Sequence, residues 1–375
     1  MDRNGMLNIA VVGAAGQRAA AFKLGIESTG RARVKAVCDV NCDKLDDAAA
    51  LWGVKEKFTD YQEMLEKADV DVVMIGTPSN LHASQAIYAL QNGKHVYSEI
   101  PAGLSMDECR QLVESCKTAK GSYVMGENVC YMKEYMVIEE MVNRGLFGEL
   151  YFAQGEYLHD LKKLFETSRW RRDLLVGVNG ITYGTHSIGP ILEWMKGDRI
   201  TRLSCTGTGH HYVDENSRSY AQENGCLMLA NTVQGRTVEI RVDMLSTRPY
   251  GLNFRLQGTK GTFESIHDWT GGRTRMWAED ICGGGDREKW VDFSEIEKDY
   301  IPEIWRDVPK SVVQESTHWG IDYVTIREYI GYLYGQNVFK AGIHEAMDMT
   351  LPGLVSQESI CEDGKWLEVP DTRNW

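Results

Sequence analysis

The stretch Asn179–Met195 places a phenol, Tyr183, and an imidazole, His186, three residues apart at the start of an apolar pattern. A histidine has a reference pKa of about 6.5, which suits proton transfer at neutral pH, and a neighbouring phenol can take part in the same chemistry. The pair therefore indicates a site of acid–base catalysis. The alternative is that His186 only satisfies the buried start of a helix.

A helix has to position this pair. Apolar side chains follow at i, i+3, i+4 and i+7, which is the spacing of one buried helical stripe: Ile188, Ile191, Leu192 and Met195. We therefore expect Tyr183 and His186 at the mouth of a helix that is anchored by its own apolar face.

A glycine turn follows the first apolar run, Leu7–Val12, and precedes a helical pattern that extends to about Ser28. Strand, glycine turn and helix in this order are typical of a site where a pyrophosphate meets a helix N-terminus. The match to G-x-G-x-x-G is incomplete, because Ala15 and Arg18 stand at the second and third glycine positions. The turn residues that we expect to contact a dinucleotide are Gly13, Ala15 and Gly16.

An acidic residue, Asp39, ends the second predicted strand, Val34–Cys38, and lies 26 positions after Gly13. A carboxylate at this point suits two hydrogen bonds to an adenosine ribose, and it would repel a 2′-phosphate. The spacing therefore favours NAD over NADP. The alternative role for Asp39 is that of a helix N-cap, since Asn41 and Asp43 lie at the same boundary.

Further apolar strands alternate with helical stretches over the first 127 residues. The predicted strands are Asp71–Ile75, Lys94–Ser98 and Tyr123–Met125, and the helices are Ser84–Asn92 and Ser105–Ala119. This alternation predicts a doubly wound parallel sheet, a Rossmann domain of the α/β class. Ligands bind at the carboxyl ends of such strands, where the following residues lie: Thr77, Asn80, His82, Glu99 and Asn128.

The pattern changes after Tyr131. A helix over roughly 134–144 is followed by alternating strands joined by polar or glycine turns. The strands are Leu150–Tyr157, Ile200–Thr206, Cys226–Ala230, Thr237–Val242, Leu252–Gly258 and Gly261–Ser265. They predict an α+β domain with a mainly antiparallel open sheet. We assign 1–127 to NAD binding and 128–375 to substrate binding, with a C-terminal helix that can pack back on the first domain.

Composition limits the classes of function. The 375 residues exceed one ordinary core, and the net charge of −13 disfavours binding to a nucleic-acid backbone. There is no apolar run of membrane-spanning length, and the first residues lack the regions of a signal peptide. The nine cysteines form no CxxC pair, and the histidines and cysteines show no ligand spacing, so we expect no metal. We expect a cytoplasmic protein that acts on a small molecule.

These residues, in this order, resemble the Gfo/Idh/MocA family of NAD(P)-dependent oxidoreductases over nearly the whole chain. Members usually carry Glu-Lys-Pro after the fourth strand, with the lysine serving in proton transfer, whereas this chain has Glu99-Ile100-Pro101. Their Asp-x-Gly-x-His-x-x-Asp box corresponds to 182–189, in which both acids are missing. Isoleucine cannot carry a proton, so an ordinary dehydrogenase mechanism is not expected.

Where this chain differs from the usual family motifs, it resembles one branch of the family, the NAD-dependent glycosidases of glycoside hydrolase family 109. That branch is expected to have an apolar residue between the glutamate and the proline. Its other motifs match Glu127-Asn128-x-Cys130-Tyr131, Gly148-Glu149, Tyr157-Leu158-His159-Asp160, Trp170-Arg171, Tyr183-x-Thr185-His186, Arg248-Pro249-Tyr250, Gly258-Thr259-Lys260-Gly261 and His318-x-Gly320-x-Asp322-Tyr323. Several motifs in register are far more specific than the glycine turn alone.

The resemblance implies a set of site residues. Those expected to touch NAD are Gln17, Arg18, Asp39, His82, Glu99, Asn128 and Tyr183. Those expected to touch the sugar are Tyr157, Arg171, Tyr183, His186 and Tyr250, and two further histidines, His159 and His318, are candidates to line the same pocket. For these two, ordinary structural roles remain the alternative, and the tyrosines can also be core aromatic residues.

The resemblance also implies a mechanism. NAD takes a hydride from C3 of a glycoside, which makes the C2 proton acidic. Loss of that proton expels the group at C1, water adds, and the retained NADH returns the hydride. Because Ile100 replaces the lysine, we assign the C3 hydroxyl proton to His186 and the C2 proton to Tyr183.

Two other interpretations remain. The first is an NAD-dependent sugar or glycoside dehydrogenase that stops at the 3-keto product. The second is a sensor of NAD or sugar without catalysis, since Ile100 is consistent with lost chemistry. In each case we expect a small-molecule partner, no nucleic acid, no membrane and a homo-oligomer, for which an exposed sheet face is a plausible surface.

Overall fold

The structure is a computed structural model that describes all 375 residues except 1–4, 175–178, 269–270, 284–288 and 317. The chain divides into two units. Unit 1 comprises Met1–Tyr131, Asp307–Met347 and Thr372–Trp375, and unit 2 comprises Met132–Arg306 and Asp348–Asp371. In the described part of the chain, no helix has the length and apolar character needed to cross a membrane.

Unit 1 is built on a six-stranded sheet with the order β3-β2-β1-β4-β5-β6, in which every pairing is parallel. The strands are β1 (Leu7–Val12), β2 (Ala32–Cys38), β3 (Glu56–Phe58), β4 (Val72–Ile75), β5 (His95–Ser98) and β6 (Tyr123–Met125). The order extends in both directions from β1, and right-handed crossovers in opposite directions place helices on both faces. The predicted doubly wound Rossmann sheet is confirmed. The sequence missed β3, a three-residue edge strand without a buried residue.

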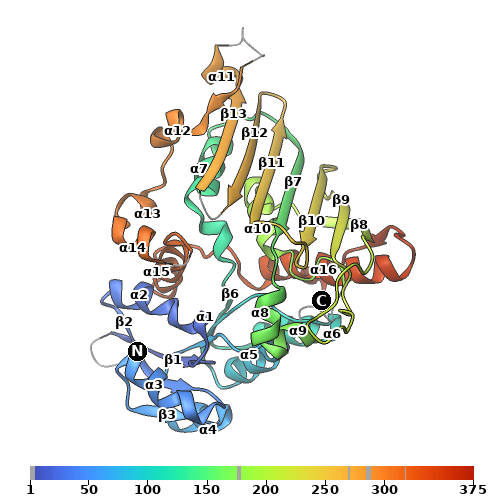
Figure 1. Ribbon diagram of the computed structural model, residues 1–375. Helices are drawn as coiled ribbons and strands as arrows, with labels where there is room; N and C mark the ends of the chain where they lie inside the picture. Colours follow the sequence, from blue (N-terminus) through green and yellow to red (C-terminus); the bar gives the residue numbers. More distant parts are fainter. Residues whose placement is uncertain (1–4, 175–178, 269–270, 284–288, 317) are drawn as a thin grey trace. The chain divides into compact units, whose positions relative to one another are not determined.

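Helices connect these strands as expected, with bounds that differ by a few residues (Figure 1). They are α1 (Gln17–Ala20), α2 (Phe22–Ser28), α3 (Cys42–Trp52), α4 (Tyr61–Lys67), α5 (His82–Gln91) and α6 (Met106–Thr118), with the 3-10 turns η1 (Ser79–Leu81) and η2 (Asn128–Tyr131). The single helix predicted after the glycine turn is divided in two at Ala21.

Unit 1 also contains segments from the C-terminal part of the chain. They form α14 (Lys310–Glu315), α15 (Ile321–Leu333), the start of α16 (Ile343–Cys361) and η4 (Thr372–Asn374). Helix α15 packs on α2, where Gly25 permits close contact because a Cβ there would lie 2.6 Å from Cβ of Ile326. The contacts of these apolar faces group Asp307–Met347 with unit 1. The sequence assigned 128–375 to substrate binding, with a C-terminal helix that can pack back on the first domain, and that assignment of roles stays a prediction.

Unit 2 is built on a nine-stranded sheet with the order β14-β13-β12-β11-β7-β10-β9-β8-β15. The strands are β7 (Leu150–Leu158), β8 (Ile200–Gly207), β9 (Gly225–Thr232), β10 (Thr237–Asp243), β11 (Gly251–Gly258), β12 (Gly261–Asp268), β13 (Gly271–Ala278), β14 (Val291–Asp292) and β15 (Leu367–Glu368). The predicted mainly antiparallel sheet is confirmed. It is mixed, however, because β7 lies between β10 and β11 and pairs with β10 in parallel.

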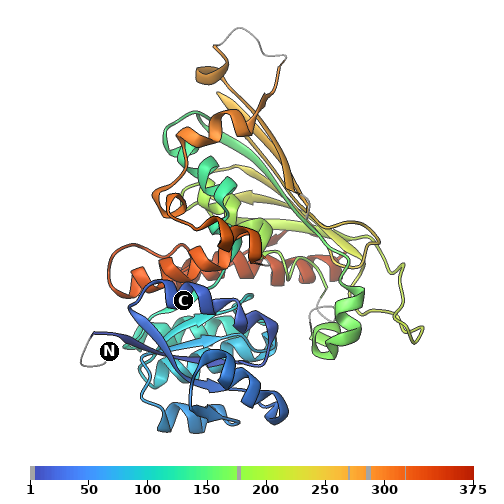
Figure 2. The same ribbon diagram turned by 60° about the vertical axis from the view of Figure 1, so that its left-hand side comes forward.

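Helices of unit 2 cover one face of this sheet (Figure 2). The unit contains α7 (Lys133–Asn143), α8 (Lys162–Thr167), α9 (Arg169–Leu174), α10 (Thr185–Trp194), α11 (Glu279–Cys282), α12 (Phe293–Ile296), η3 (Glu297–Asp299), α13 (Glu303–Arg306) and the larger part of α16. Helix α10 contacts β7, β10 and α7, and its side chains Ile188 and Ile191 are fully buried. The predicted helix behind Tyr183 and His186 therefore exists and is anchored by its apolar stripe.

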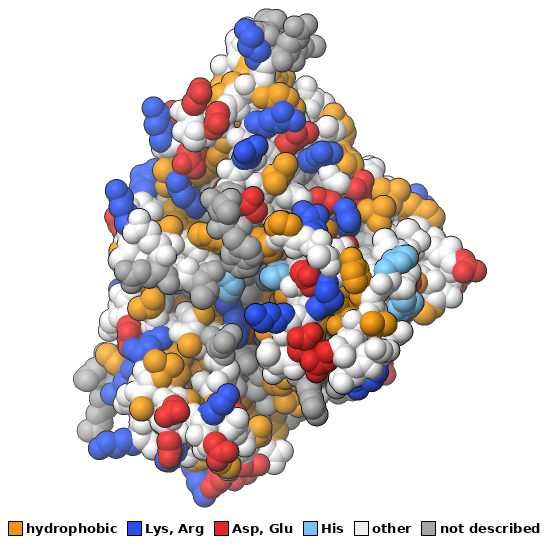
Figure 3. Space-filling view, in the orientation of Figure 1, with side chains coloured by type: hydrophobic (Ala, Val, Ile, Leu, Met, Phe, Trp, Pro, Cys, Tyr) orange, Lys and Arg blue, Asp and Glu red, His pale blue; other side chains and the backbone are white. Residues whose placement is uncertain are grey.

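The side chains that face away from these helices alternate along the same strands. Leu227, Leu229 and Ile266 are exposed there, among charged pairs such as Arg275–Glu264. On the face of the molecule seen in Figure 3, basic and acidic side chains are interspersed.

Candidate cofactor and substrate sites

The glycine turn of unit 1 packs against the ends of two neighbouring strands. Gly13 has a φ of +75°, and a Cβ there would lie 2.6 Å from the carbonyl oxygen of Gly76. The amides of Gly13 and Ala14 both donate to the carbonyl of Cys38, at 2.9 and 3.2 Å. Because glycine alone adopts this conformation in so little space without strain, the turn presents bare backbone at the carboxyl edge of the sheet.

Asp39 orients this turn from the end of β2. Its Oδ2 accepts a hydrogen bond of 2.9 Å from the amide of Ala15, and its Oδ1 accepts one of 2.8 Å from the amide of Asn41. The N-cap of α3 is Asn41, whose side chain accepts from the amide of Lys44, so Asp39 is not a cap. Each carboxylate oxygen can accept a further hydrogen bond. The ribose contact of Asp39 stays a prediction.

The loop after β4 is held by His82. This buried imidazole has Nδ1 at 2.9 Å from the carbonyl oxygen of Pro101 and Nε2 at 2.9 Å from that of Thr77. The Thr77 hydroxyl donates to Gln85, and Asn80 is exposed. His82 therefore ties the loop after β4 to the loop after β5. The predicted cofactor contacts of His82, Thr77 and Asn80 stay predictions.

A cluster of charged side chains surrounds Arg18, which lies in α1. The guanidinium donates from Nη2 to Oδ1 of Asp322 at 2.7 Å and from Nη1 to Oδ2 at 2.9 Å, a bidentate pair. Its Nε lies 2.8 Å from Oε2 of Glu99, and the side chains of Arg18 and Glu99 are only 19% and 12% exposed. Asn128 donates to Oδ1 of Asp322 at 2.8 Å. We call these residues, together with His318, the Arg18 cluster.

Electrostatics keep Arg18 and Asp322 ionised. Burial works to lower the pKa of Arg18, but the charges of Asp322 and Glu99 hold that pKa well above its ordinary value. Burial works to raise the pKa of Asp322, but the Arg18 charge and the hydrogen bond from His318 bring it far below its ordinary range. Enclosed charges are stable only when they are paired in this way.

Unit 1 fits NAD on two observations. Gly13 keeps the turn in close contact with the backbone of Gly76, because a Cβ at Gly13 would lie 2.6 Å from the Gly76 carbonyl oxygen, and this contact holds the turn at the carboxyl edge of the sheet. In addition, Oε1 of Glu99 is buried and has no hydrogen-bond partner, although Oε2 of the same carboxylate is paired with Arg18. A buried acceptor without a donor is costly, and a sugar hydroxyl of a bound dinucleotide would satisfy it.

Unit 2 brings most of the predicted substrate residues together. The rings of Tyr157, His159, Tyr183, His186 and Tyr250 form one group, which we call the aromatic cluster. The Tyr183 and His186 centroids are 5.4 Å apart with planes at 89°, and Tyr157 lies 5.5 Å from Tyr183 and 5.4 Å from His186. Tyr250 lies 6.1 Å from Tyr157 and 5.1 Å from His159.

A glycine allows close contact between β7 and α10, two elements that carry residues of this cluster. Tyr157 is on β7, two residues after Gly155, where a Cβ would lie 2.7 Å from the carbonyl oxygen of Ser187 in α10. The backbone of β7 can therefore contact the first turn of α10, which carries His186. Any side chain at position 155 would push the two elements apart.

The segment before α10 is fixed by α16. The amide of Ile181 donates to the hydroxyl of Ser356 at 2.7 Å. Gly180 has a φ of +82°, and a Cβ there would lie 2.5 Å from the same hydroxyl oxygen. The backbone on both sides of Tyr183 is thus held by buried helices, so its phenol is carried on a rigid support.

Burial favours the neutral forms of two members of the aromatic cluster, Tyr250 and His159. Burial, with a smaller contribution from Tyr183, raises the pKa of Tyr250, so this phenol keeps its proton at neutral pH. Burial lowers the pKa of His159, which favours the neutral imidazole. Such groups donate and accept hydrogen bonds, and their ring faces suit the apolar faces of a pyranose.

Two other predicted substrate residues are not among the rings of the aromatic cluster, and their sugar contacts stay predictions. Arg171 is half-buried on α9, with its guanidinium 4.4 Å from the centroid of Trp170. His318 belongs to unit 1, where its Nδ1 lies 2.7 Å from Oδ2 of Asp322. The side chain of Gln17 lies outside the described residues. Sequence reasoning gave Asp322 no role, although its place four residues after His318 in the His-x-Gly-x-Asp-Tyr motif was the available signal.

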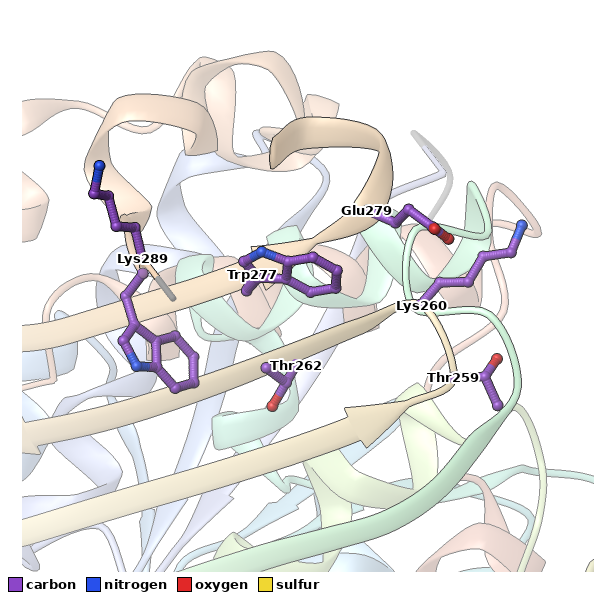
Figure 4. A pocket seen from close by; sticks show the side chains of 7 residues that line it. Thr259, Lys260, Thr262, Trp277, Glu279 and Lys289 are labelled. Atoms are coloured by element: carbon purple, nitrogen blue, oxygen red, sulfur yellow. The ribbon is translucent and has the colours of Figure 1, made fainter. Parts of the chain in front are cut away.

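Two cavities of unit 2 lie away from these residues. One of about 310 Å³ lies beside the turn between β11 and β12 and the end of β13 (Figure 4). Its lining residues are Thr259, Lys260, Thr262, Trp277, Glu279, Lys289 and Trp290. Another, of about 250 Å³, surrounds Asp214. No predicted site residue lines either cavity. Among the described residues, no three His, Cys, Asp or Glu side chains are grouped so that they could hold a metal ion.

Comparison with known proteins identifies both parts of the chain. Residues 7–127 match the family model of the oxidoreductase family with an NAD-binding Rossmann fold. The chain is 28% identical to a glycosyl hydrolase family 109 protein of Saccharopolyspora erythraea, with 97% of this chain and 83% of that protein covered. It is also 28% identical to the alpha-N-acetylgalactosaminidase of Shewanella oneidensis, with 90% and 79% covered.

Solved structures share the fold. The WlbA dehydrogenase of Bordetella pertussis, in complex with NADH and UDP-GlcNAcA, is 19% identical with a TM-score of 0.74, and 97% of this chain and 99% of that chain are covered. Levoglucosan dehydrogenase, in complex with NADH and levoglucosan, is 16% identical with a TM-score of 0.79 and the same coverage. Residues 131–375, well over half of the chain, match the model of the glycosyl hydrolase 109 C-terminal domain. The chain therefore belongs to glycosyl hydrolase family 109 and has an NAD-binding Rossmann domain.

Proposed function

We propose that this protein is an NAD-dependent glycoside hydrolase that cleaves its substrate by transient oxidation at C3. The observation that carries the proposal is the aromatic cluster, in which a phenol and an imidazole meet edge to face among further tyrosines. The relative of Shewanella oneidensis is named an alpha-N-acetylgalactosaminidase, which makes glycosides of N-acetylgalactosamine the first substrates to test.

The cluster supplies the proton transfers that this reaction needs. His186 takes the proton of the C3 hydroxyl, and Tyr183 takes the proton at C2 once C3 is a carbonyl. Removal of the C2 proton expels the alcohol at C1, and water then adds at C1. Tyr157 and Tyr250 hold the sugar ring through their faces and hydroxyls, and Arg171 and His159 are further candidates to bind its oxygens.

Residues of unit 1 would hold the cofactor. Gly13 would keep the turn tight against Gly76 beneath the dinucleotide, Asp39 would accept from the ribose hydroxyls, and Glu99 and Asn128 would bind at the edge formed by β5 and β6. When bound, NAD would supply the acceptor for the C3 hydride and the donor that restores it, so the overall reaction would be hydrolysis without net oxidation.

Ile100 supports hydrolysis over simple oxidation. Its side chain is 7% exposed and carries no proton, at the position where a sugar dehydrogenase of the wider family uses lysine. Proton transfer therefore falls to the aromatic cluster. We further propose that the protein is cytoplasmic, for which all nine cysteines being free thiols gives support, and that it is a homo-oligomer, which light scattering would test.

The test is a panel of chromogenic glycosides, assayed with the purified protein and no added NAD. We expect many turnovers per bound cofactor. Deuterium at C3 of the substrate should slow cleavage, and the released sugar should gain deuterium at C2 in heavy water. An active preparation that shows neither effect would contradict the mechanism.

The competing proposal is a sugar or glycoside 3-dehydrogenase. It is favoured by the fold shared with dehydrogenases. This activity would produce one NADH for each sugar consumed and would stop when the bound NAD is reduced. The same assay followed by absorbance of NADH therefore separates the two functions.

A further inference from the structure

The carboxylate of Asp322 has an unusually complete set of partners. It lies in the first turn of α15, and its side chain is 7% exposed. Oδ1 accepts from Nη2 of Arg18 at 2.7 Å and from Asn128 at 2.8 Å. Oδ2 accepts from Nη1 of Arg18 at 2.9 Å and faces Nδ1 of His318 at 2.7 Å. The same Nδ1 also lies 3.2 Å from Nη1 of Arg18.

The partners of Asp322 come from both ends of the predicted cofactor site. Arg18 begins the helical segment after the glycine turn, and Asn128 follows β6. Asp322 itself comes from a segment almost two hundred residues further along the chain than Asn128, with a separation of 194. One side chain therefore fixes the orientation of two residues that sequence resemblance assigns to NAD.

The effect extends to Glu99 through Arg18. The bidentate pair leaves Nε of Arg18 to meet Oε2 of Glu99 at 2.8 Å. This contact determines which oxygen of Glu99 is paired and leaves Oε1 as the buried acceptor without a partner. Rotation of the guanidinium away from Asp322 would therefore also misplace the oxygen that is available to a ligand.

We propose that Asp322 is a positioning residue for the cofactor: it holds Arg18, Asn128 and, through Arg18, Glu99 in the orientations that retain NAD. This inference rests on the cofactor role proposed for Glu99 and Asn128. A bidentate guanidinium–carboxylate pair fixes geometry better than a single contact, which is the property that such a role needs.

The obvious alternative is that Asp322 only attaches α15 to the rest of unit 1. That role predicts a loss of stability without a specific loss of cofactor. The two roles differ in what added NAD does. A misplaced binding site is filled again at high NAD concentration, whereas a damaged fold is not.

The test compares Asp322→Asn with the wild type and with Asp46→Asn. Asp46 is exposed on α3 and pairs with Lys57, so the control makes the same chemical change in the same unit outside the cluster. Protein freed of cofactor is titrated with NADH, and nicotinamide fluorescence gives the dissociation constant. Circular dichroism and thermal melting report folding.

We expect Asp322→Asn to bind NADH at least about tenfold more weakly, a change of roughly 1.4 kcal/mol, and to lose NAD on gel filtration. Turnover of a glycoside should then depend on added NAD and recover at saturation, with the KM for the glycoside unchanged. The control should match the wild type. A folded Asp322→Asn protein with wild-type affinity for NADH would overturn the proposal.

If Asp322→Asn does not fold, Asp322→Glu decides the question. It keeps the charge that neutralises Arg18 but displaces the carboxylate by one methylene. We expect a folded protein whose dissociation constant for NADH is raised several-fold, and wild-type affinity in that protein would overturn the proposal. NADH affinity is measured without a glycoside, so this result stands apart from whether the protein proves to be a glycosidase.

Discussion

The two candidate sites are held in place by different physics. In unit 1, the Arg18 cluster is a set of enclosed charges, each fixed by ion pairs and charge-assisted hydrogen bonds. In unit 2, the aromatic cluster consists of rings that contact one another, and burial keeps His159 and Tyr250 neutral. The charged cluster resists rearrangement, which suits a retained cofactor. The aromatic cluster carries hydroxyl and imidazole groups that can exchange protons, which suits the proposed catalysis.

The largest predicted effect is the loss of turnover in His186→Ala, which removes an imidazole from the aromatic cluster. Loss of a general base typically lowers turnover by about 10²–10⁴-fold, and NAD content should not change because His186 is not among the residues expected to hold the cofactor. The measurement is turnover of a glycoside with a good leaving group, alongside the NAD content of the purified protein. His210→Ala, at an exposed histidine of the same unit, is the control. Turnover near that of the wild type would remove His186 from the mechanism.

Gly13→Ala should weaken cofactor binding in unit 1. Both Gly13 and Gly53 have positive φ, +75° and +66°, but a Cβ at Gly53 would meet nothing within 4 Å. Alanine at either position strains the backbone by about 1–2 kcal/mol, and at Gly13 alone it also collides with the backbone of Gly76. We expect Gly13→Ala to weaken NADH binding by more than tenfold, measured by fluorescence titration, and Gly53→Ala to leave it unchanged. Equal affinities in the two variants would separate the glycine turn from cofactor binding.

Asp39→Asn should sharpen the account of cofactor choice. The substitution removes the negative charge while keeping one acceptor oxygen for the amide of Ala15. We expect affinity for NADH to fall by about tenfold and the ratio of NADH to NADPH affinity to fall further, because repulsion of a 2′-phosphate is lost. The control is Asp43→Asn, at the start of α3, which should change neither the NADH affinity nor the ratio of affinities. An unaltered ratio in Asp39→Asn would show that the carboxylate does not select the cofactor.

The smallest predicted effect is on thermal stability. It involves Glu134, a carboxylate of unit 2 whose pKa is shifted in the opposite direction from that of Asp322. Glu134 on α7 accepts from Ser265 and Thr274, and burial, only partly offset by these bonds, raises its pKa. A carboxyl with a raised pKa in the folded state stabilises the fold below its unfolded pKa and loses that contribution as pH rises through the folded value. Asp322 has a lowered pKa, so its contribution is present at neutral pH and is lost as pH falls below about 4, the unfolded pKa of aspartate.

Glu134→Gln tests this opposition. The neutral amide accepts the same two hydroxyls without an ionised group, so the melting temperature should rise by a few degrees at neutral pH. The gain should vanish near pH 4, where Glu134 is protonated. Melting curves across this range, compared with those of Glu139→Gln on the same helix, provide the measurement. A gain that persists in acid would mean that ionisation of Glu134 is not the cause.

Much of the fold could be predicted because it is local. Alternating apolar patterns indicated five of the six strands of the parallel sheet, and the stripe behind His186 indicated α10. Edge strands such as β3 and β14 escaped because so few residues pair there. The parallel pairing of β7 with β10 also escaped, because hairpin order says nothing about a strand inserted from earlier in the chain.

The sequence indicated individual residues of the candidate sites, but it did not indicate all of the contacts between them. Motif resemblance indicated Tyr157, Tyr183, His186 and Tyr250, and the structure brings these rings together. His318 contacts Asp322 in unit 1, and its predicted place in the sugar pocket stays a prediction. The ion pair between Arg18 and Asp322 joins residues 304 positions apart, and no local pattern encodes a contact of that range.

The interleaving of the units has a consequence for how the protein is made. Unit 1 takes its first residues from the start of the chain and its last from Thr372–Trp375, where Arg110 stacks on Trp375 at 4.5 Å. As the polypeptide leaves the ribosome, the first 131 residues lack Asp322 and α15, which pair with Arg18 and pack on α2, until residues 132–306 have been synthesised. We therefore expect the cofactor site to be completed late in maturation, and a fragment that ends at Tyr131 to lack α15.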